Sequence, residues 1–348
     1  MLICIFLSLF GMFFGLLKNN SKYKFNNPKI NKSIFWTILI IFSFTSIIMI
    51  FRYVQLFITS GGNLVSILIN KDQLLIDSGI MGYFYMIGIS ILLLLPYCNI
   101  RRKYKLLIIV FILISYLLYP KRSYFILSLF IVIYDYCTSN KDGINKNFLS
   151  NLNIIKLIIV ALTFMIVFHY SQVSFNKSVY ENNYMNTIGK YNRFEAIFLD
   201  TAIYINGNIS NSDLYLELYA NDKPDLILNN TFYPIYTTLS NFGLIKSEVT
   251  LNNYFIKTGD LQTNTINMFV YYYADAGYIY GIFFEFIILL FFWYSSNKKS
   301  SLKRVLYPMI LYAAIVSFRS NELIMQYFIV NIFIVIIATT KIYWRKQQ

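Results

Sequence analysis

The sequence predicts an all-α, polytopic integral membrane protein with about nine to ten transmembrane helices, and three observations lead to this fold class. Hydrophobic residues make up 57% of the 348 residues. Charged residues make up 13%, which is too few to cover a soluble domain of this length. Apolar runs that approach the thickness of a bilayer recur along the chain, and they are continuous, which favours helices over alternating strands.

Nine apolar runs are candidate membrane spans. The first lacks a basic n-region and an obvious small-residue cleavage site, so we interpret it as a retained helix and not as a signal peptide. Several runs are shorter than the roughly 20 residues that cross a bilayer, so their ends are expected to extend into the flanks. The candidate runs are 1–17, 34–51, 80–97, 105–119, 122–137, 156–171, 264–294, 305–317 and 323–340.

The runs divide the chain into three parts within one membrane domain. Residues 1–171 are predicted to form the N-terminal transmembrane helices, and residues 264–348 the C-terminal ones. Residues 172–263 form a long polar segment, rich in Asn, which we expect to lie on the outer membrane surface as short amphipathic helices. A connection of this length in a compact protein is usually functional.

The basic residues predict the orientation. Of the 30 Lys and Arg residues, 19 lie in five short segments that fall on one side of the membrane, and this side is predicted to be cytoplasmic. The segment 172–263 and the N-terminus are then outside the cytoplasm, and the C-terminus is inside. The five segments are 18–33, 98–105, 138–156, 297–304 and 341–348.

The same distribution argues against several function classes. The net charge of +14 comes from these short segments, and no basic helix carries aromatic residues for stacking on bases, so nucleic-acid binding is not expected. The chain has one His, and its three cysteines, Cys4, Cys98 and Cys137, lack the spacing of a metal or redox motif. No metal site and no cofactor is predicted.

Four arginines on the predicted outer side are candidate ligands for an anion: Arg52, Arg122, Arg193 and Arg319. The planar guanidinium suits phosphate, and arginines just outside the hydrocarbon can bind the headgroup of a lipid-linked pyrophosphate. The alternative for each is a membrane anchor or an ion pair, and this alternative is favoured for Arg52. Function is favoured for Arg122, which opens a span where the helix N-terminus also attracts anions.

Three side chains are candidate bases: His169, Glu195 and Asp275. Asp275 lies about ten residues into the run 264–294, where an acid is costly unless it has a partner or faces water. We interpret it as a base or as the orienter of an arginine, whereas His169 could also be a packing residue. For Glu285, which an unbroken helix would place about 80° from Asp275, a structural hydrogen bond is favoured.

Tyrosines gather in the outer segment and at the start of the run 264–294, and their role is open. Their rings could stack on sugars or form an interfacial belt. They include Tyr233, Tyr236, Tyr271, Tyr272, Tyr273, Tyr278 and Tyr280.

Three motifs resemble those of the Wzy-type O-antigen and capsular repeat-unit polymerases of bacteria, part of a wider polymerase/ligase group. The first is Pro-Lys-Arg-Ser-Tyr-Phe-Ile-Leu at 120–127, which opens a span. The second is Asn-Arg-Phe at 192–194, near the start of the long outer segment. The third is Asn-Thr at 264–265, followed by Tyr-Ala-Asp-Ala-Gly-Tyr-Ile-Tyr-Gly at 273–281. The motifs spread over about residues 105–294. The chain departs from the family in having fewer spans and in Glu285.

This resemblance implies a GT-C-like, metal-independent glycosyltransferase of the plasma membrane. Its substrates would be undecaprenyl-pyrophosphate-linked oligosaccharides, and its partners a chain-length regulator and the flippase of the same pathway. Arg122 and Arg193 would clamp the pyrophosphate, with Arg319 assisting. An O-antigen-type ligase and a flippase for lipid-linked glycans are the rival interpretations. A ligase of this group uses a His in the outer segment, whereas His169 lies at the end of a span.

Overall fold

The computed structural model forms two compact units, each described here by itself. Unit 1 comprises Met1–Lys18, Leu149–Tyr294 and Ala313–Gln326, and unit 2 comprises Asn19–Phe148, Ser295–Tyr312 and Tyr327–Gln348. The residues that the structure describes are 28–59, 79–118, 122–139, 212, 214, 217, 231–232, 235–236, 239–240, 243–245, 256–258, 261–263, 270–296, 301–316, 323 and 325–339.

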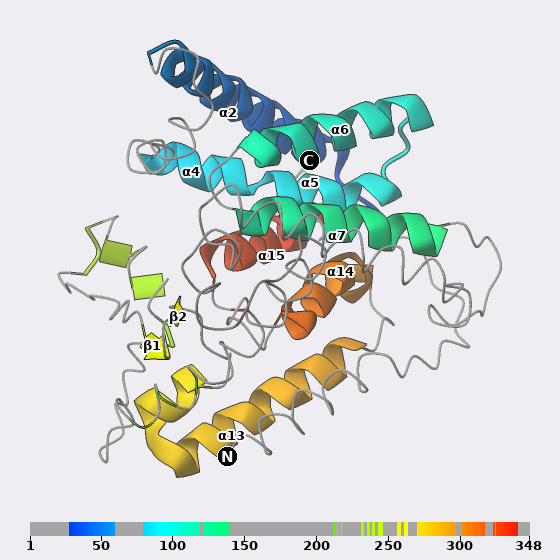
Figure 1. Ribbon diagram of the computed structural model, residues 1–348. Coiled ribbons are helices and arrows are strands. Elements are labelled where there is room, and N and C mark those ends of the chain that lie inside the picture. Colours follow the sequence, from blue (N-terminus) through cyan, green and yellow to red (C-terminus); the bar gives the residue numbers. More distant parts are fainter. Residues whose placement is uncertain are drawn as a thin grey trace, which may run out of the picture. The chain divides into compact units, whose positions relative to one another are not determined.

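The chain is all-α in class, with one small hairpin (Figure 1). In unit 1 the described elements are β1 (Ile256–Thr258), β2 (Leu261–Thr263) and α13 (Val270–Ser296). In unit 2, to which most of α14 and α15 belong, they are α2 (Lys32–Thr59), α4 (Gly79–Met86), α5 (Gly88–Leu94), the 3₁₀ turn η1 (Leu95–Tyr97), α6 (Arg102–Leu118), α7 (Arg122–Ser139), α14 (Ser301–Ile315) and α15 (Gln326–Thr339).

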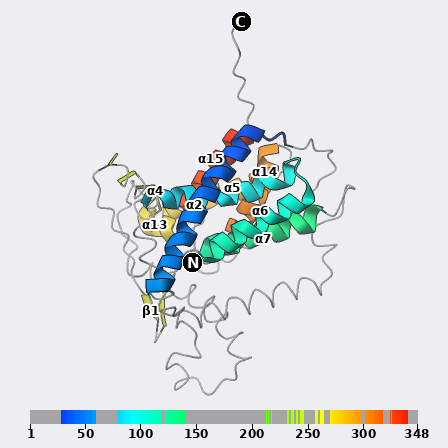
Figure 2. The ribbon, with the colours of Figure 1, turned by 90° about the horizontal axis from the view of Figure 1, so that it is seen from above.

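Helix α2 begins with a side-chain cap and crosses its neighbours at an angle (Figure 2). Asn31 Oδ1 accepts the N–H groups of Ser33 at 3.1 Å and Ile34 at 3.4 Å, which satisfies two of the four free donors at the helix start. The helix then packs on α4, α5 and α6. The backbone N–H of Asn31 also donates to the carbonyl of Ala338, which joins the start of α2 to the end of α15.

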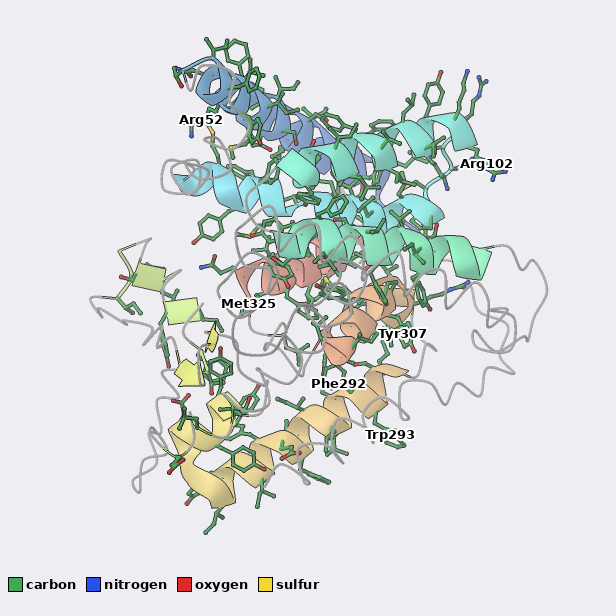
Figure 3. The ribbon with its side chains drawn as sticks, viewed as in Figure 1. Arg52, Arg102, Phe292, Trp293, Tyr307 and Met325 are labelled. Carbon is green, nitrogen blue, oxygen red and sulfur yellow. The ribbon has the colours of Figure 1, made fainter. Side chains whose placement is uncertain are left out.

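Helix α2 is apolar on both its faces. Phe35, Ile38, Phe42 and Met49 recur at helical spacing and are buried. A second stripe at the same spacing is exposed, and it consists of Trp36, Ile40, Phe44, Ile47 and Phe51. Exposed apolar side chains also line α6 (Leu106, Leu107, Val110 and Ile114) and the second part of α13, from which Trp293 projects (Figure 3).

Among the described residues, one helix, α2, is both long and apolar enough to cross a membrane. Four shorter apolar helical stretches accompany it, at Met81–Tyr97, Ser123–Asp135, Ile279–Ser295 and Gln326–Thr339.

The core of unit 2 contains a row of aromatic rings. Tyr85, Tyr116, Tyr124 and Tyr327 come from α4, α6, α7 and α15, and consecutive ring centroids lie 5.3, 5.7 and 5.2 Å apart in edge-to-face geometry. All four side chains are buried, and the hydroxyl of Tyr85 donates to the carbonyl of Ser115. The row therefore links α4, α6 and α7 to α15, which is distant from them in sequence.

The helices differ from the predicted runs in three details. Helix α2 continues past the run 34–51 to Thr59, so Arg52 lies inside a helix (Figure 3). The run 80–97 divides into α4, α5 and η1. The segment 172–263 was expected to contain short helices only, but β1 and β2 pair antiparallel there, with Ile256 opposite Thr263.

Candidate functional site

Helix α13 is bent sharply at Gly277, and this bend shapes the candidate site in unit 1 (Figure 1). Gly277 has φ 72° and ψ 178°, a conformation essentially restricted to glycine. Residues 270–276 and 278–296 therefore form two helical arms, which we call the first and second arm of the elbow. The single unbroken span predicted for 264–294 was wrong, because a glycine within an apolar run gives no sign of its φ.

The two arms are fastened by side chains of the first arm that pack on the second. The Tyr272 ring stacks on Phe284, with centroids 5.8 Å apart and planes within 17°. The Tyr273 ring packs directly on Gly281. A Cβ atom at position 281 would lie 2.5 Å from Tyr273 Cδ1, which is too close for any residue other than glycine. The Tyr273 hydroxyl then donates to Glu285 Oε2 at 2.5 Å. Gly281 is thus required for the approach that this hydrogen bond completes.

Glu285 has the structural hydrogen bond that the sequence predicted. Its side chain is buried, and Tyr273 comes from the other side of the bend. The helical-wheel angle between Glu285 and Asp275 does not apply, because Gly277 interrupts the helix between them. Tyr272 and Tyr273 are also buried, so these two tyrosines are core residues and neither stack on a ligand nor form a belt.

Among the predicted site residues, the structure describes the side chains of Arg52 and Asp275. Arg52 is half-buried within α2, and Asp275 is 1% exposed. Its Oδ2 accepts the backbone N–H of Thr231, at 2.7 Å, from the long segment 172–263. Thr231 is fully buried and precedes a helical turn in which the carbonyl of Phe232 accepts the N–H groups of Ile235 and Tyr236. This hydrogen bond connects that segment to the first arm.

The other predicted site residues are placed in part or not at all. Arg122 is the first residue of α7, as the sequence predicted for a residue that opens a span, but its side chain lies outside the described residues. His169, Arg193, Glu195 and Arg319 also lie outside them. The grouping of these side chains around a substrate therefore stays a prediction.

Sequence reasoning missed a second polar site, where α4 meets α5 in unit 2. In an unbroken helix the Ser90 N–H would bond to the Met86 carbonyl, four residues earlier. Here the Asn331 amide lies between them. Its Oδ1 accepts the Ser90 N–H at 2.7 Å, and its Nδ2 donates to the Met86 carbonyl at 3.0 Å. Asn331 is a polar residue in an apolar run, which is the signal that could have identified it.

Tyr116, in α6, also binds the backbone where the helix is interrupted between α4 and α5. Its hydroxyl donates to the carbonyls of Tyr85, at 3.0 Å, and Met86, at 3.3 Å. Gly88 lets α5 approach closely, because a Cβ there would lie 2.5 Å from both the Phe42 ring and the Tyr116 hydroxyl. A side chain inserted into a helical ladder is an established cause of a helix bend.

Three of the basic segments gather at one end of unit 2. Lys32, at the start of α2, and Lys105 both interact electrostatically with the thiol of Cys98. The guanidinium of Arg304, in α14, lies over the ring of Tyr97, with its central carbon 5.9 Å from the centroid. The Lys105 ammonium donates to the carbonyl of Pro96 at 3.0 Å. Segments that the charge count assigned to one side thus lie together.

Cys98 provides a pH-dependent test of this end of unit 2. Burial raises the pKa of its thiol to about 11, although Lys105 and Lys32 lower it. The thiolate is the reactive form, so at pH 8 native Cys98 should be alkylated about 100-fold more slowly than an ordinary thiol, and faster as pH rises toward 11. The measurement is the rate of iodoacetamide labelling in a Cys4→Ser, Cys137→Ser variant. The same variant unfolded in dodecyl sulfate is the control, and equal rates in the two states at pH 8 would contradict the burial.

Comparisons with protein-family models, curated proteins and solved structures gave no match.

Proposed function

We propose that this protein is a polytopic, GT-C-like membrane enzyme that polymerises lipid-linked oligosaccharide repeat units on the outer face of the bacterial plasma membrane. The product would be an O-antigen, capsular or exopolysaccharide chain. The proposal rests on the motif resemblance at 120–127, 192–194 and 264–281, together with the physical features that follow.

Exposed apolar helix faces support a membrane setting. The outward stripe of α2 and the exposed sides of α6 and α13 carry large apolar side chains, such as Phe51 at 74% and Ile279 at 81% exposure. A helix that is apolar all round requires an apolar solvent on its outer face. Lipid provides that solvent, and the gathered basic end of unit 2 then faces the cytoplasm by the positive-inside rule.

The proposed reaction is a glycosyl transfer between two lipid-linked glycans. A hydroxyl of the acceptor repeat unit attacks the anomeric carbon of the growing chain, and the bond from that carbon to the pyrophosphate oxygen breaks. The hydroxyl proton passes to a base, for which His169, Glu195 and Asp275 are the candidates from the sequence. Undecaprenyl pyrophosphate leaves with the bonding electrons, and guanidinium groups stabilise the developing charge.

The observation that carries this proposal is the position of Arg122 at the first residue of α7. The first N–H groups of a helix have no partners within the helix, and the helix dipole adds a positive potential at the same place. An arginine at this position, directly after Pro120 and Lys121 in the sequence, favours binding of a pyrophosphate. The motif resemblance adds Arg193 and Arg319 as further candidate ligands of the pyrophosphate.

The test is the gel profile of surface polysaccharide from a strain that lacks the gene, complemented with wild type or Arg122→Ala. We expect glycan of a single repeat unit in the deletion strain and a full ladder after complementation with wild type. With Arg122→Ala we expect loss of at least about 90% of the long chains, because removing one charged ligand weakens pyrophosphate binding by about 2–3 kcal/mol. Arg102→Ala is the matched control, because Arg102 also begins a helix but lies at the basic end of unit 2 (Figure 3).

Each other profile excludes the proposal in a recognisable way. Long glycan that is not attached to its normal acceptor indicates the ligase. Single lipid-linked repeats that accumulate on the inner leaflet indicate the flippase. A ladder that is unchanged in the deletion strain shows that the motif resemblance does not extend to function. Equal loss in Arg102→Ala and Arg122→Ala would remove Arg122 from the site.

A further inference from the structure

We infer that Asp275 is a positioning residue, which fixes the turn after Thr231 on the elbow of α13, and that it is not the base of the reaction. The consequence for catalysis rests on the proposed function. The structural part, a hydrogen bond between two named atoms, does not. Of the three candidate bases, this leaves His169 and Glu195 for proton transfer.

The first reason is the hydrogen bond itself. Asp275 Oδ2 accepts the Thr231 N–H at 2.7 Å, and both residues are buried, at 1% and 0% exposure. The two residues are 44 positions apart, so the bond joins the segment 172–263 to a helix outside it. A buried N–H that lost this acceptor would cost about 1–3 kcal/mol, which gives the bond a structural role.

The second reason is that the first arm cannot move independently of the second arm. Two residues before Asp275, Tyr273 packs on Gly281 and donates to Glu285. Two residues after it, Gly277 holds a conformation that few residues adopt. The backbone around Asp275 is therefore constrained on one side by the contacts of Tyr273 with the second arm and on the other by the bend at Gly277. Through Thr231, Asp275 contacts the start of the turn formed by Phe232, Ile235 and Tyr236.

The third reason is the burial of the carboxylate. A base must reach the hydroxyl proton of a sugar that enters from the membrane surface, directly or through one water. The Asp275 side chain is in the interior, where it holds backbone. Its effect on a substrate is therefore exerted through the segment it fixes, which includes the Tyr-Pro-Ile-Tyr sequence at 233–236.

Four variants of the full chain separate a positioning role from a base. Asp275→Asn keeps an oxygen that can accept the Thr231 N–H but cannot act as a base at neutral pH. Asp275→Ala removes the acceptor. Thr231→Pro removes the donor, because proline has no N–H. Thr231→Val keeps the N–H and removes a buried hydroxyl that has no hydrogen-bond partner among the described residues, so it is the matched control.

The first readout is hydrogen exchange of the Thr231 amide in the purified protein, which does not depend on activity. We expect exchange at least about tenfold faster in Asp275→Ala than in wild type, and a change of less than about threefold in Asp275→Asn. The second readout is the rate and pH profile of polymerisation by isolated membranes, corrected for the amount of each variant. We expect the rate to fall about tenfold or more in Asp275→Ala and Thr231→Pro, and to stay within about threefold in Asp275→Asn and Thr231→Val.

An unchanged pH profile in Asp275→Asn supports the positioning role. Two results would overturn it. The first concerns Asp275→Asn. If this variant accumulates normally and its Thr231 amide is protected from exchange, but it is as inactive as Asp275→Ala, the charge of Asp275 is required. The other is rapid amide exchange in wild type, which would show that the bond is absent. The two proposals can fail separately. If the Thr231 amide is protected but deletion of the gene leaves the glycan ladder unchanged, the proposed function is refuted and the hydrogen bond to Asp275 stands.

Discussion

Replacing Asn331 with leucine is expected to destabilise unit 2 by about 3 kcal/mol. Leucine has a similar size but cannot bridge the Ser90 N–H and the Met86 carbonyl, which the Asn331 amide joins in wild type. The same change removes the bond from Asn331 Nδ2 to the Tyr327 carbonyl, at 2.5 Å. The helix could regain a bond from Ser90 to Met86 only by straightening at Gly88, where Phe42 and Tyr116 pack closely. The measurement is the Tm of the purified protein in detergent.

The control for this variant lies on the same helix. Phe333 is 64% exposed, so Phe333→Leu should change the free energy of unfolding by less than about 0.5 kcal/mol. If Asn331→Leu and Phe333→Leu have the same Tm as wild type, the amide does not hold the interruption between α4 and α5.

Replacing Gly277 with alanine is the second change with a large expected effect. Apart from its chain neighbours and the backbone of its own helix, no described residue has an atom within 4 Å of the position that a Cβ would occupy, so the cost comes from the backbone and not from a clash. At φ 72° and ψ 178° this cost is about 1–3 kcal/mol. Relief of the strain requires a change in the angle between the arms, which would separate Tyr273 from Glu285 and displace Asp275. We expect a lower Tm and, under the proposed function, loss of the glycan ladder.

Gly243→Ala is the matched comparison for this prediction. Gly243 also has a positive φ, of 68°, and, its chain neighbours apart, none of the described residues comes within 4 Å of its Cβ position, but it is exposed and lies outside the elbow. Its substitution should cost about 1 kcal/mol and preserve the ladder. A Gly277→Ala protein with normal Tm and normal chain length would show that the bend is not needed.

The positions of several helices could be predicted from the sequence because local signals mark their ends. The runs 105–119 and 122–137 correspond closely to α6 and α7, since basic residues and Pro120 separate them from their neighbours in the sequence. Helix α2 extends beyond the predicted run 34–51 and reaches Thr59. A long apolar helix can include one arginine, and α2 does so with Arg52 half-buried.

The interruptions could not be predicted, because their causes are distant in sequence. The run 80–97 stays apolar through Ile87, and its interruption depends on Asn331 and Tyr116. At the elbow, Asp275 was correctly identified as an acid that needs a partner, and the partner is a backbone N–H that no residue type reveals. Sequence patterns report local preference and polarity, whereas these contacts are decided by tertiary packing.

The bridge made by Asn331 has a consequence for the order in which this protein is built. Its two ends are 241 residues apart, so α4 and α5 leave the ribosome well before the side chain that completes their junction is synthesised. At translation rates of roughly 5–20 residues per second, the interval is on the order of ten to fifty seconds. During that time residues 86–90 can form an ordinary helical turn. Insertion of α15 would then convert the turn to its final form, as a late step that completes unit 2.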